Sequence, residues 1–429
     1  MKNYLKNSII YQVYTRNFTK EGTFKAVTSK LDYIKDLGVD VVYVLPVSPI
    51  GEINRKGVLG SPYSIKDYFK INPELGNIDD FKELIDQTHK RNMKFMIDLV
   101  FNHTSRDSWI KENHPEWMFH DKGGNISNKV ADWSDVFDLN TDNKDLINYL
   151  VSVVDYYATL GVDGFRFDVA SLVSKEFFIQ MKEMLNKKHP ETILLAESVH
   201  PGFVNSLRSQ NYHCLSDEEL FEVGFDLLYP YDSYENLRNY LQTGEIRWLD
   251  YFKFSLLLED SMTNSATLRI RCMENHDQKR LFEFTKDKTL LRNLVALYPF
   301  MNGPMFIYNG LETKADHLES LFDKDEMSWE FDEEWLNFVK KLIAYKKDPK
   351  NINLNNTSVF LTKGENLALR NNFKDGSFTY GLFSLTGKET IINDNELIDG
   401  VYKDILSGNS YEIKNHEIAV KEPLYLIKA

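Results

Sequence analysis

The sequence predicts a (β/α)8 barrel with a short excursion domain after the third strand and a C-terminal antiparallel β-sandwich domain. Short apolar, β-branched runs alternate with amphipathic helical patterns through most of the chain. This alternation lapses once, in residues 103–140, and gives way to closely spaced alternating runs after about residue 347. Alternating strands and helices imply parallel strands joined by right-handed crossovers, and eight such units close a barrel.

The first elements establish the alternation. Residues 9–14 are apolar, β-branched and aromatic, which predicts a buried strand. A helix should follow, because apolar side chains then recur at spacings of three and four, namely at Phe24, Val27, Leu31 and Ile34. Gly38 is placed to end that helix with a positive φ, and residues 41–47 predict the second strand.

The same pattern continues to an eighth strand. A second helix carries Phe81, Leu84 and Ile85, and residues 95–101 predict the third strand. Gly161 should end a long helix whose apolar face consists of Leu146, Leu150, Val153, Val154 and Tyr157. The fourth strand lies within residues 161–170, and the remaining four are predicted at residues 192–196, 224–229, 268–274 and 304–308.

Two further regions complete the predicted organisation. Residues 103–140 are aromatic, polar and glycine-containing, and a segment this long between a strand and a helix is usually functional. We assign residues 1–102 and 141–347 to the barrel, 103–140 to the excursion domain and 348–429 to the β-sandwich. The last domain is predicted from runs in which apolar and polar residues alternate, at residues 358–362, 367–370, 379–385 and 424–427.

Composition narrows the class of partner. The 429 residues carry 51 Lys and Arg against 64 Asp and Glu, a formal net charge of −13. This balance disfavours nucleic acid and anionic membrane surfaces and favours a neutral substrate. Cys214 and Cys272 are too few for a disulfide framework and are expected to be buried thiols. The N-terminal residues lack the apolar stretch of a signal peptide, so we expect a cytoplasmic protein.

Ionisable residues cluster at the predicted C-terminal ends of the barrel strands, where barrel enzymes carry their catalytic groups. Asp98 lies in the third strand, and Asn102 and His103 follow it. The other strand ends contribute Arg166 and Asp168, then Glu197, then His276 and Asp277. Because like charges raise one another's pKa, several carboxylates gather only where a site uses them.

Retaining glycoside hydrolysis is one chemistry that needs such an arrangement. One carboxylate must be ionised to attack the anomeric carbon, while a second, about 5–5.5 Å away, protonates the leaving oxygen and later activates water. Side chains two apart on a strand share a face, so Arg166 lies beside Asp168 and would keep it anionic. Glu197 follows Leu195 and Ala196, and burial would keep it protonated.

Four ordered segments resemble the sequence blocks of the α-amylase family of glycoside hydrolases, family 13. They are Asp98-Leu99-Val100-Phe101-Asn102-His103, Gly164-Phe165-Arg166-Phe167-Asp168, Ala196-Glu197-Ser198 and Glu274-Asn275-His276-Asp277. Further similarity lies in residues 38–49, 63–68, 137–140 and 303–310. The resemblance covers residues 1 to about 330, and the tail fits the family's C-terminal β domain.

The resemblance implies a role for each residue. Asp168 would be the nucleophile, Glu197 the general acid/base, and Asp277 the third acid that stabilises the oxocarbenium-like transition state. The substrate-binding residues would be Tyr63, stacking on the sugar, His103 and His276, donating to its hydroxyls, Arg166, holding Asp168, and Asp98, supporting the site. Three tryptophans are weaker candidates for further sugar subsites, namely Trp109, Trp117 and Trp133.

Departures from the family pattern leave alternatives open. Many α-amylases have a Lys-His pair shortly after the nucleophile that contributes to a calcium site, whereas Asp168 is followed here by Val169-Ala170-Ser171-Leu172. We therefore predict no required cofactor or metal, although calcium is possible. A valine after the nucleophile is also typical of relatives that cleave α-1,6 bonds. The family commonly has Asp after the tyrosine at position 63, and this chain has Ser64. The stretch at residues 54–60 contains glycine and is basic, which leaves open that the protein is a transferase.

The leading hypothesis is a hydrolase that cleaves α-1,4 bonds of malto-oligosaccharides or starch-type glucans with retention. The alternatives are an α-glucan transglycosylase or an α-1,6-glucosidase of the same family. A non-catalytic sugar-binding relative is a remote third.

Overall fold

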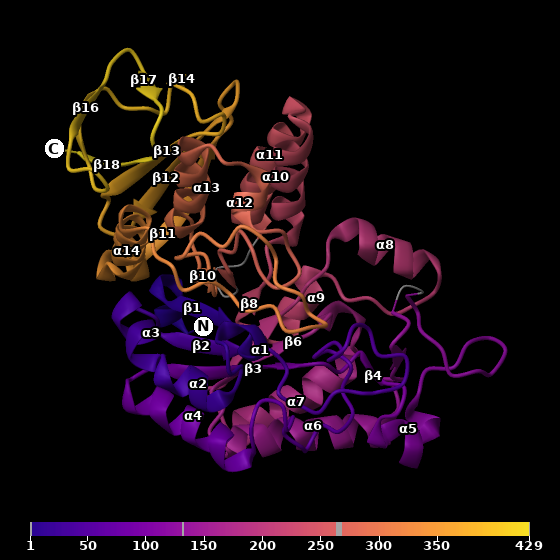
Figure 1. Ribbon diagram of the computed structural model, residues 1–429. Coiled ribbons are helices and arrows are strands. Elements are labelled where there is room, and N and C mark those ends of the chain that lie inside the picture. The colour runs from indigo at the N-terminus through magenta and orange to yellow at the C-terminus, as the bar shows by residue number, and fades with distance from the viewer. Residues whose placement is uncertain (1, 131–132, 263–267, 429) are drawn as a thin grey trace. The chain divides into compact units, whose positions relative to one another are not determined.

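The computed structural model describes residues 2–130, 133–262 and 268–428 (Figure 1). The chain forms two compact units. One comprises residues 11–229 and 319–327, and we call it the nucleophile unit because it contains Asp168, the residue predicted from the sequence to be the nucleophile. The other comprises residues 1–10, 230–318 and 328–429, and we call it the C-terminal unit.

Parallel strands form the centre of the nucleophile unit. They pair in the order β1 (Ile9–Val13), β2 (Val41–Val44), β3 (Lys94–Leu99), β6 (Gly164–Phe167), β7 (Ile193–Ala196) and β8 (Leu227–Leu228). Every residue of β2, β6 and β7 is buried, as expected for strands covered on both faces. The first residue of β6 is Gly164. A larger residue would crowd the neighbouring strand there, because a Cβ at this position would lie 3.1 Å from the Cβ of Ile193.

Helices connect these strands as predicted. They are α1 (Thr15–Phe18), α2 (Phe24–Ser29), α3 (Leu31–Leu37), α4 (Ile78–Lys90), α5 (Trp109–Asn113), α6 (Lys144–Thr159), α7 (Lys175–Lys188), α8 (Pro201–Ser209) and α9 (Asp217–Glu222), with 3₁₀ turns η2 (Pro115–Trp117) and η3 (Ala170–Leu172). The apolar face predicted for α6 is buried, and Gly161 follows that helix with φ 102°. Gly38 ends α3 with φ 101°.

The first predicted helix is broken in two. Residues 24–37 form α2 and α3, separated at Lys30, whose φ and ψ are −99° and −1°. The Thr28 and Ser29 hydroxyls donate to the carbonyls of Phe24 and Ala26 at 2.9 and 2.7 Å. Such bonds from the side chain to the backbone compete with the helical ladder, and they account for the break.

Several predicted strands are shorter in the structure. The run at residues 41–47 ends as a strand at Val44, two residues before Pro46, which has no N–H for the ladder. Residues 224–229 form only the two-residue strand β8, since Gly224 has φ 99°. The strand predicted at 268–274 is reduced to β9 (Leu268–Arg269) and a parallel bridge between Arg271 and Met305.

The excursion between β3 and α6 contains a small antiparallel pair. Its strands are β4 (His103–Ser105) and β5 (Val136–Asp138), and His103 pairs with Asp138. The pairing returns the chain to the end of β3, so the excursion is attached beside the predicted site residues.

The C-terminal unit carries its own helices and sheets. After η1 (Asn3–Asn7) its elements are α10 (Tyr231–Thr243) and α11 (Ile246–Met262), which lie side by side, then β9, α12 (Leu281–Phe284), α13 (Lys288–Phe300), β10 (Met305–Tyr308), α14 (Glu333–Lys347) and η4 (Pro349–Asn353) (Figure 1).

Both cysteines are buried thiols, as predicted, and burial raises the pKa of Cys214 to about 11.

An antiparallel β domain closes the chain. A six-stranded sheet has the order β11 (Leu354–Phe360), β12 (Asn366–Phe373), β13 (Phe378–Ser384), β18 (Leu424–Lys428), β15 (Gly400–Asp404) and β16 (Ser410–Ile413), and β14 (Thr390–Asn393) pairs with β17 (Glu417–Val420). Apolar residues of both sheets share one core. Among the described residues, every helix is too short or too polar to span a bilayer.

Candidate active site

A buried guanidinium organises the predicted site residues of the nucleophile unit. Arg166 comes from β6 and its side chain is fully buried. Its Nη1 donates to Asp98 Oδ1 at 2.9 Å and to Asp168 Oδ1 at 2.8 Å, while its Nη2 pairs with Glu197 Oε2 at 2.9 Å. Burial lowers the pKa of Arg166, but Asp98 and Glu197 more than offset this, and the pKa lies well above its usual value. One cation thus holds three carboxylates.

Asp98 supports this guanidinium from β3. Its register partner on β6 is Arg166 itself, so the two side chains meet across adjacent strands. Asp98 Oδ2 also accepts the hydroxyls of Tyr43 at 2.7 Å and Tyr63 at 2.9 Å. Both carboxylate oxygens are therefore occupied by protein groups, and Asp98 holds Arg166 and Tyr63 in place.

Asp168 directly follows β6, and only one of its carboxylate oxygens accepts a hydrogen bond from the described residues. Oδ1 accepts from Arg166, whereas Oδ2 makes no hydrogen bond to any residue that the structure describes. Burial raises the pKa of Asp168 well above its usual value, Arg166 opposes that rise, and the Glu197 and Asp98 carboxylates add to it. The geometry leaves Oδ2 as the oxygen that can react.

Glu197 follows β7 and is fixed by a strained backbone. Val169 has φ 41° and ψ 47°, a left-handed conformation that costs a β-branched residue on the order of 1–3 kcal/mol. Its N–H donates to Glu197 Oε2 at 2.7 Å. This hydrogen bond joins the residue after Asp168, at the end of β6, to Glu197 at the end of the neighbouring strand β7.

His103 lies near the Asp168 oxygen that Arg166 does not contact. Its Nε2 is 3.8 Å from Asp168 Oδ2, and its Nδ1 is 3.2 Å from Asn102 Nδ2. Trp133 packs against the imidazole with ring centroids 5.2 Å apart. Burial lowers the pKa of His103 to about 4, against a smaller opposing effect of Asp135. The imidazole is therefore neutral at physiological pH.

The buried neutral His103 makes folding stability depend on pH. Between the ordinary pKa of 6.5 and the folded value of about 4, the unfolded chain binds a proton that the folded chain does not. Stability is full above the upper value and falls as the pH is lowered through this window, by about 3 kcal/mol in total. Urea unfolding from pH 7.5 to 4 should show the wild type losing this much more than His103→Gln. His213→Gln, at an exposed position, should follow the wild type. Parallel curves for wild type and His103→Gln would contradict the prediction.

Two predicted site residues lie in the C-terminal unit. His276 is buried and its Nε2 lies 3.0 Å from Oδ2 of Asp277, whose side chain is 38% exposed. Asn275 Oδ1 accepts the Asp277 N–H at 2.8 Å. Glu274 anchors the segment, because its carboxylate accepts from Arg280 at 2.8 Å and from a backbone N–H at 2.7 Å.

The three tryptophans differ in their surroundings. Trp109 stacks on Tyr149 with centroids 5.4 Å apart, and Trp117 stacks on His114 at 3.8 Å. Protein rings thus cover one face of each, while Trp133 lies beside His103. Of the three, Trp133 is the one that the fold brings to a predicted site residue.

Sequence reasoning missed three groups that hold the site together. They are the Tyr43 hydroxyl, the Val169 N–H and Lys129, whose Nζ is 3.5 Å from Asn102 Oδ1. Tyr43 carried one usable signal, because a hydroxyl inside a buried strand needs a partner. Lys129 is 27 residues from its partner, and no periodicity connects the two.

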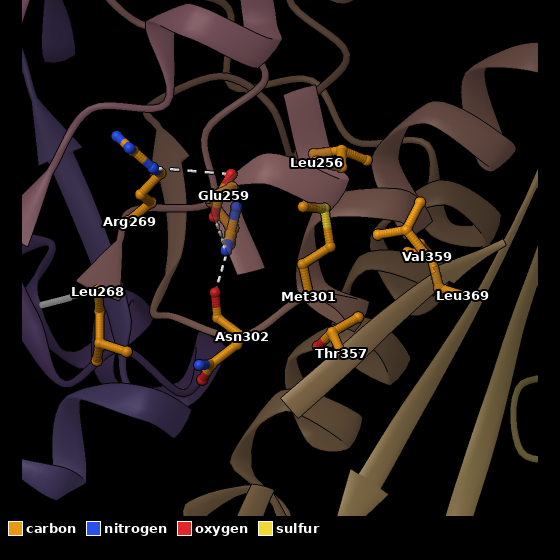
Figure 2. Close-up of a pocket in the computed structure, with 10 residues that line it drawn as sticks. Leu256, Glu259, Leu268, Arg269, Met301, Asn302, Thr357, Val359 and Leu369 are labelled. Atoms are coloured by element: carbon orange, nitrogen blue, oxygen red, sulfur yellow. Dashed lines mark hydrogen bonds and ion pairs between the residues drawn. The ribbon is translucent and has the colours of Figure 1, made fainter. Parts of the chain in front are cut away.

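A separate cavity in the C-terminal unit contains none of the predicted site residues. Figure 2 shows Leu256, Met301, Val359 and Leu369 along one side of it. On the other side Glu259 pairs with Arg269 at 3.8 Å. Glu259 also pairs with Arg271 at 2.5 Å. The ion pairs neutralise much of the local charge, and the cavity lies within the packing of α11 against the β11–β12 sheet.

Comparison with known proteins identifies the relatives of this chain. The family model described as the catalytic domain of alpha amylase matches residues 12–134 and 108–375, and that of the bacterial alpha amylase C-terminal domain matches residues 365–426. A solved α-amylase from Lactobacillus plantarum is 37% identical, covers 99% of both chains and superposes with a TM-score of 0.90. This likeness and the parallel strands confirm the predicted (β/α)8 barrel with an antiparallel C-terminal domain.

Relatives with other activities are also similar. The intracellular maltogenic amylase of Bacillus subtilis is 27% identical over 86% of this chain and 61% of its own length. The oligo-1,6-glucosidase of Bacillus cereus is 30% identical over 52% of this chain and 45% of its own length. The chain thus spans about three fifths of the first relative and less than half of the second.

Proposed function

The chain belongs to the α-amylase family, and from this premise we propose that it cleaves α-1,4-glucosidic bonds of malto-oligosaccharides or starch-type glucans with retention of configuration. Membership makes it an α-amylase-like glycoside hydrolase. The observation that carries the finer proposal is the Arg166 guanidinium, which binds one oxygen of Asp168 and one of Glu197 and leaves Asp168 Oδ2 without a hydrogen bond to the described residues.

In the proposed first step, Asp168 Oδ2 attacks the anomeric carbon while Glu197 gives its proton to the glycosidic oxygen. The C–O bond to the leaving sugar breaks and an ester to Asp168 forms. In the second step, Glu197 takes a proton from water, the water oxygen bonds to the anomeric carbon, and Asp168 is released. Two inversions give net retention.

The other residues bind and orient the sugar in this proposal. Tyr63 presents its ring to the sugar while its hydroxyl is anchored on Asp98. His103 and His276 donate to sugar hydroxyls, and Asp277 stabilises the positive charge that develops in the transition state. The Asp277 side chain is 38% exposed, so a bound substrate can reach its carboxylate.

We further propose that no metal ion is required. Calcium takes six to eight oxygen ligands. The Asn102 oxygen is instead 3.5 Å from the ammonium of Lys129, and the described residues include no group of three or more His, Cys, Asp or Glu suited to a metal. A divalent cation does not fit beside this ammonium. The likeness to a maltogenic amylase named intracellular supports a cytoplasmic location.

A second candidate is α-1,6-glucosidase or transglycosylase activity on the same intermediate. It is supported by Val169 directly after Asp168 and by the similarity to an oligo-1,6-glucosidase. Transfer differs from hydrolysis only in that a sugar hydroxyl, rather than water, attacks the ester.

One experiment separates these functions. The purified protein is incubated with maltoheptaose and with isomaltotriose, products are resolved by chromatography over time, and the first anomer released is identified by proton NMR. We expect shorter maltodextrins released as the α-anomer and little action on isomaltotriose. Release of the β-anomer would refute retention, cleavage of isomaltotriose would favour the second candidate, and longer products would indicate transfer. Sugar binding in a calorimetric titration without turnover would indicate a non-catalytic relative.

A further inference from the structure

Lys129 places a positive charge inside the excursion, next to the end of β3. Its Nζ lies 3.5 Å from Asn102 Oδ1 and 5.6 Å from the centroid of the Phe119 ring. Burial lowers the pKa of Lys129, while Asp138 and Asp142 act in the opposite direction. Lys129 is half-buried, and the proposed mechanism does not use it, so the position of its charge needs another explanation.

The Asn102 amide is fixed by what surrounds it. Asn102 is fully buried, and its Nδ2 lies 3.2 Å from His103 Nδ1 and 3.5 Å from Asp138 Oδ1. The Lys129 backbone N–H in turn donates to Asp138 Oδ2 at 2.8 Å. An ammonium faces the amide oxygen, whereas a carboxylate and an imidazole nitrogen face the amide NH₂. If the amide were reversed, its NH₂ would face the Lys129 ammonium and its oxygen would face the Asp138 carboxylate, and both contacts would be repulsive.

This orientation selects one tautomer of His103. Because Asn102 Nδ2 donates, His103 Nδ1 must accept, and the proton of the neutral imidazole then resides on Nε2. That Nε2 is the nitrogen 3.8 Å from Asp168 Oδ2. The donor thus points toward the reacting oxygen and the sugar that would occupy the site.

We propose that Lys129 is a positioning residue whose half-buried ammonium fixes the Asn102 amide and thereby holds His103 as the Nε2–H tautomer facing Asp168. Its effect on sugar hydrolysis rests on the proposed function, whereas the tautomer can be measured without it. The ammonium is an internal cation at the end of β3, and for this reason the arrangement needs no external one.

The test compares two lysines of the same segment. Lys129→Met keeps the length of the side chain but removes its charge, and Lys122→Met does the same at an exposed position. We expect Lys129→Met to lower kcat on maltoheptaose about 10- to 100-fold, as loss of supporting groups around a site commonly does, with Lys122→Met unchanged. The chelator EDTA should leave wild-type kcat unchanged, and added calcium should not restore Lys129→Met.

Nitrogen-15 NMR of the histidines measures the tautomer of His103 directly. A purely structural role of Lys129 would leave this tautomer unchanged. The His103 signals, assigned by their loss in His103→Gln, should report the Nε2–H tautomer in the wild type and a mixture in Lys129→Met. If activity falls while the His103 signals stay unchanged, or if both stay at wild-type values, the proposal is refuted. A wild type without glucanase activity would refute the proposed function and leave this spectroscopic comparison intact.

A second variant covers failure of Lys129→Met to fold. Lys129→Ala leaves room for a small cation, so n-propylammonium should restore kcat and the His103 signals, while neutral n-propanol should not. Equal rescue by both compounds would show that Lys129 acts by filling space rather than by its charge, and would refute the proposal.

Discussion

Replacing Asp168 with Asn should lower kcat for maltoheptaose hydrolysis by about 10⁴-fold or more, because the amide cannot form the glycosyl ester. Asn is nearly isosteric with Asp, and its carbonyl oxygen can still accept from Arg166 Nη1, now at 2.8 Å from Oδ1. Initial rates measured by reducing-end release, together with an unfolding curve near that of the wild type, would separate lost chemistry from lost structure.

Asp163→Asn is the matched control for this variant. Asp163 precedes β6 at its other end and accepts the Phe95 N–H at 2.8 Å, so the change affects the same strand without touching the site. It should retain wild-type kcat. A 2-fluoro-substituted glucosyl donor with a good leaving group should add one glycosyl mass to the peptide containing Asp168 in both wild type and Asp163→Asn. Label on another peptide, or undiminished hydrolysis by Asp168→Asn, would assign the nucleophile elsewhere.

Sequence spacing predicted the part of the site that depends on local geometry. Arg166 lies on β6 and Asp168 directly follows that strand, and the structure joins Arg166 Nη1 to Asp168 Oδ1 at 2.8 Å. Placing Glu197 at the end of the next strand was enough to bring it near the same guanidinium, since β6 and β7 are parallel neighbours. Parallel strands carry their C-terminal ends to one edge, so the order of the strands along the chain already determines which side chains meet there.

The remaining features depend on contacts that no periodicity encodes. Lys129 reaches Asn102 through a loop, and the Val169 N–H reaches Glu197 only because that residue adopts a left-handed conformation. Valine disfavours this conformation, so local propensity predicts its absence. The break at Lys30 arose in the same way, from hydroxyl bonds that compete with an otherwise regular helical pattern.

The short strands of the C-terminal domain could not be predicted from the sequence for a different reason. The structure contains β14 to β17, which the sequence pattern did not reveal, because each has four or five residues and half or more of these are at least partly exposed. Each of them contributes at least one residue to the core that it shares with the longer strands. Longer strands such as β12 and β13 were visible in the sequence because they bury residues on both faces.

Replacing Arg166 should have the second large effect, on both stability and activity. Arg166→Met leaves Asp98, Asp168 and Glu197 buried without their cation, and removal of one partner from a buried ion pair costs about 3–5 kcal/mol. Arg166→Lys keeps a charge, but one ammonium cannot reproduce the planar fork that now joins Asp168 through Nη1 to Glu197 through Nη2. We expect Arg166→Lys to lose about 10²-fold or more in kcat.

The dependence on pH distinguishes this electrostatic role from packing. Without Arg166 the pKa of Asp168 rises further, because burial and two carboxylates remain while the opposing cation is gone. Arg166→Lys keeps a cation but not the hydrogen bond from Nη1 to Asp168 Oδ1, which also lowers the pKa of Asp168, so the acid limb of its kcat profile should move to higher pH. The folded Arg166→Met variant should bind protons more tightly than its unfolded chain, so its stability deficit relative to wild type should shrink as the pH is lowered. Arg91→Met, which breaks a pair with the exposed Asp32, should destabilise the protein far less than Arg166→Met at every pH, because water screens an exposed ion pair. A deficit for Arg166→Met that does not change with pH would mean that Arg166 acts by filling the barrel rather than by lowering the pKa of Asp168.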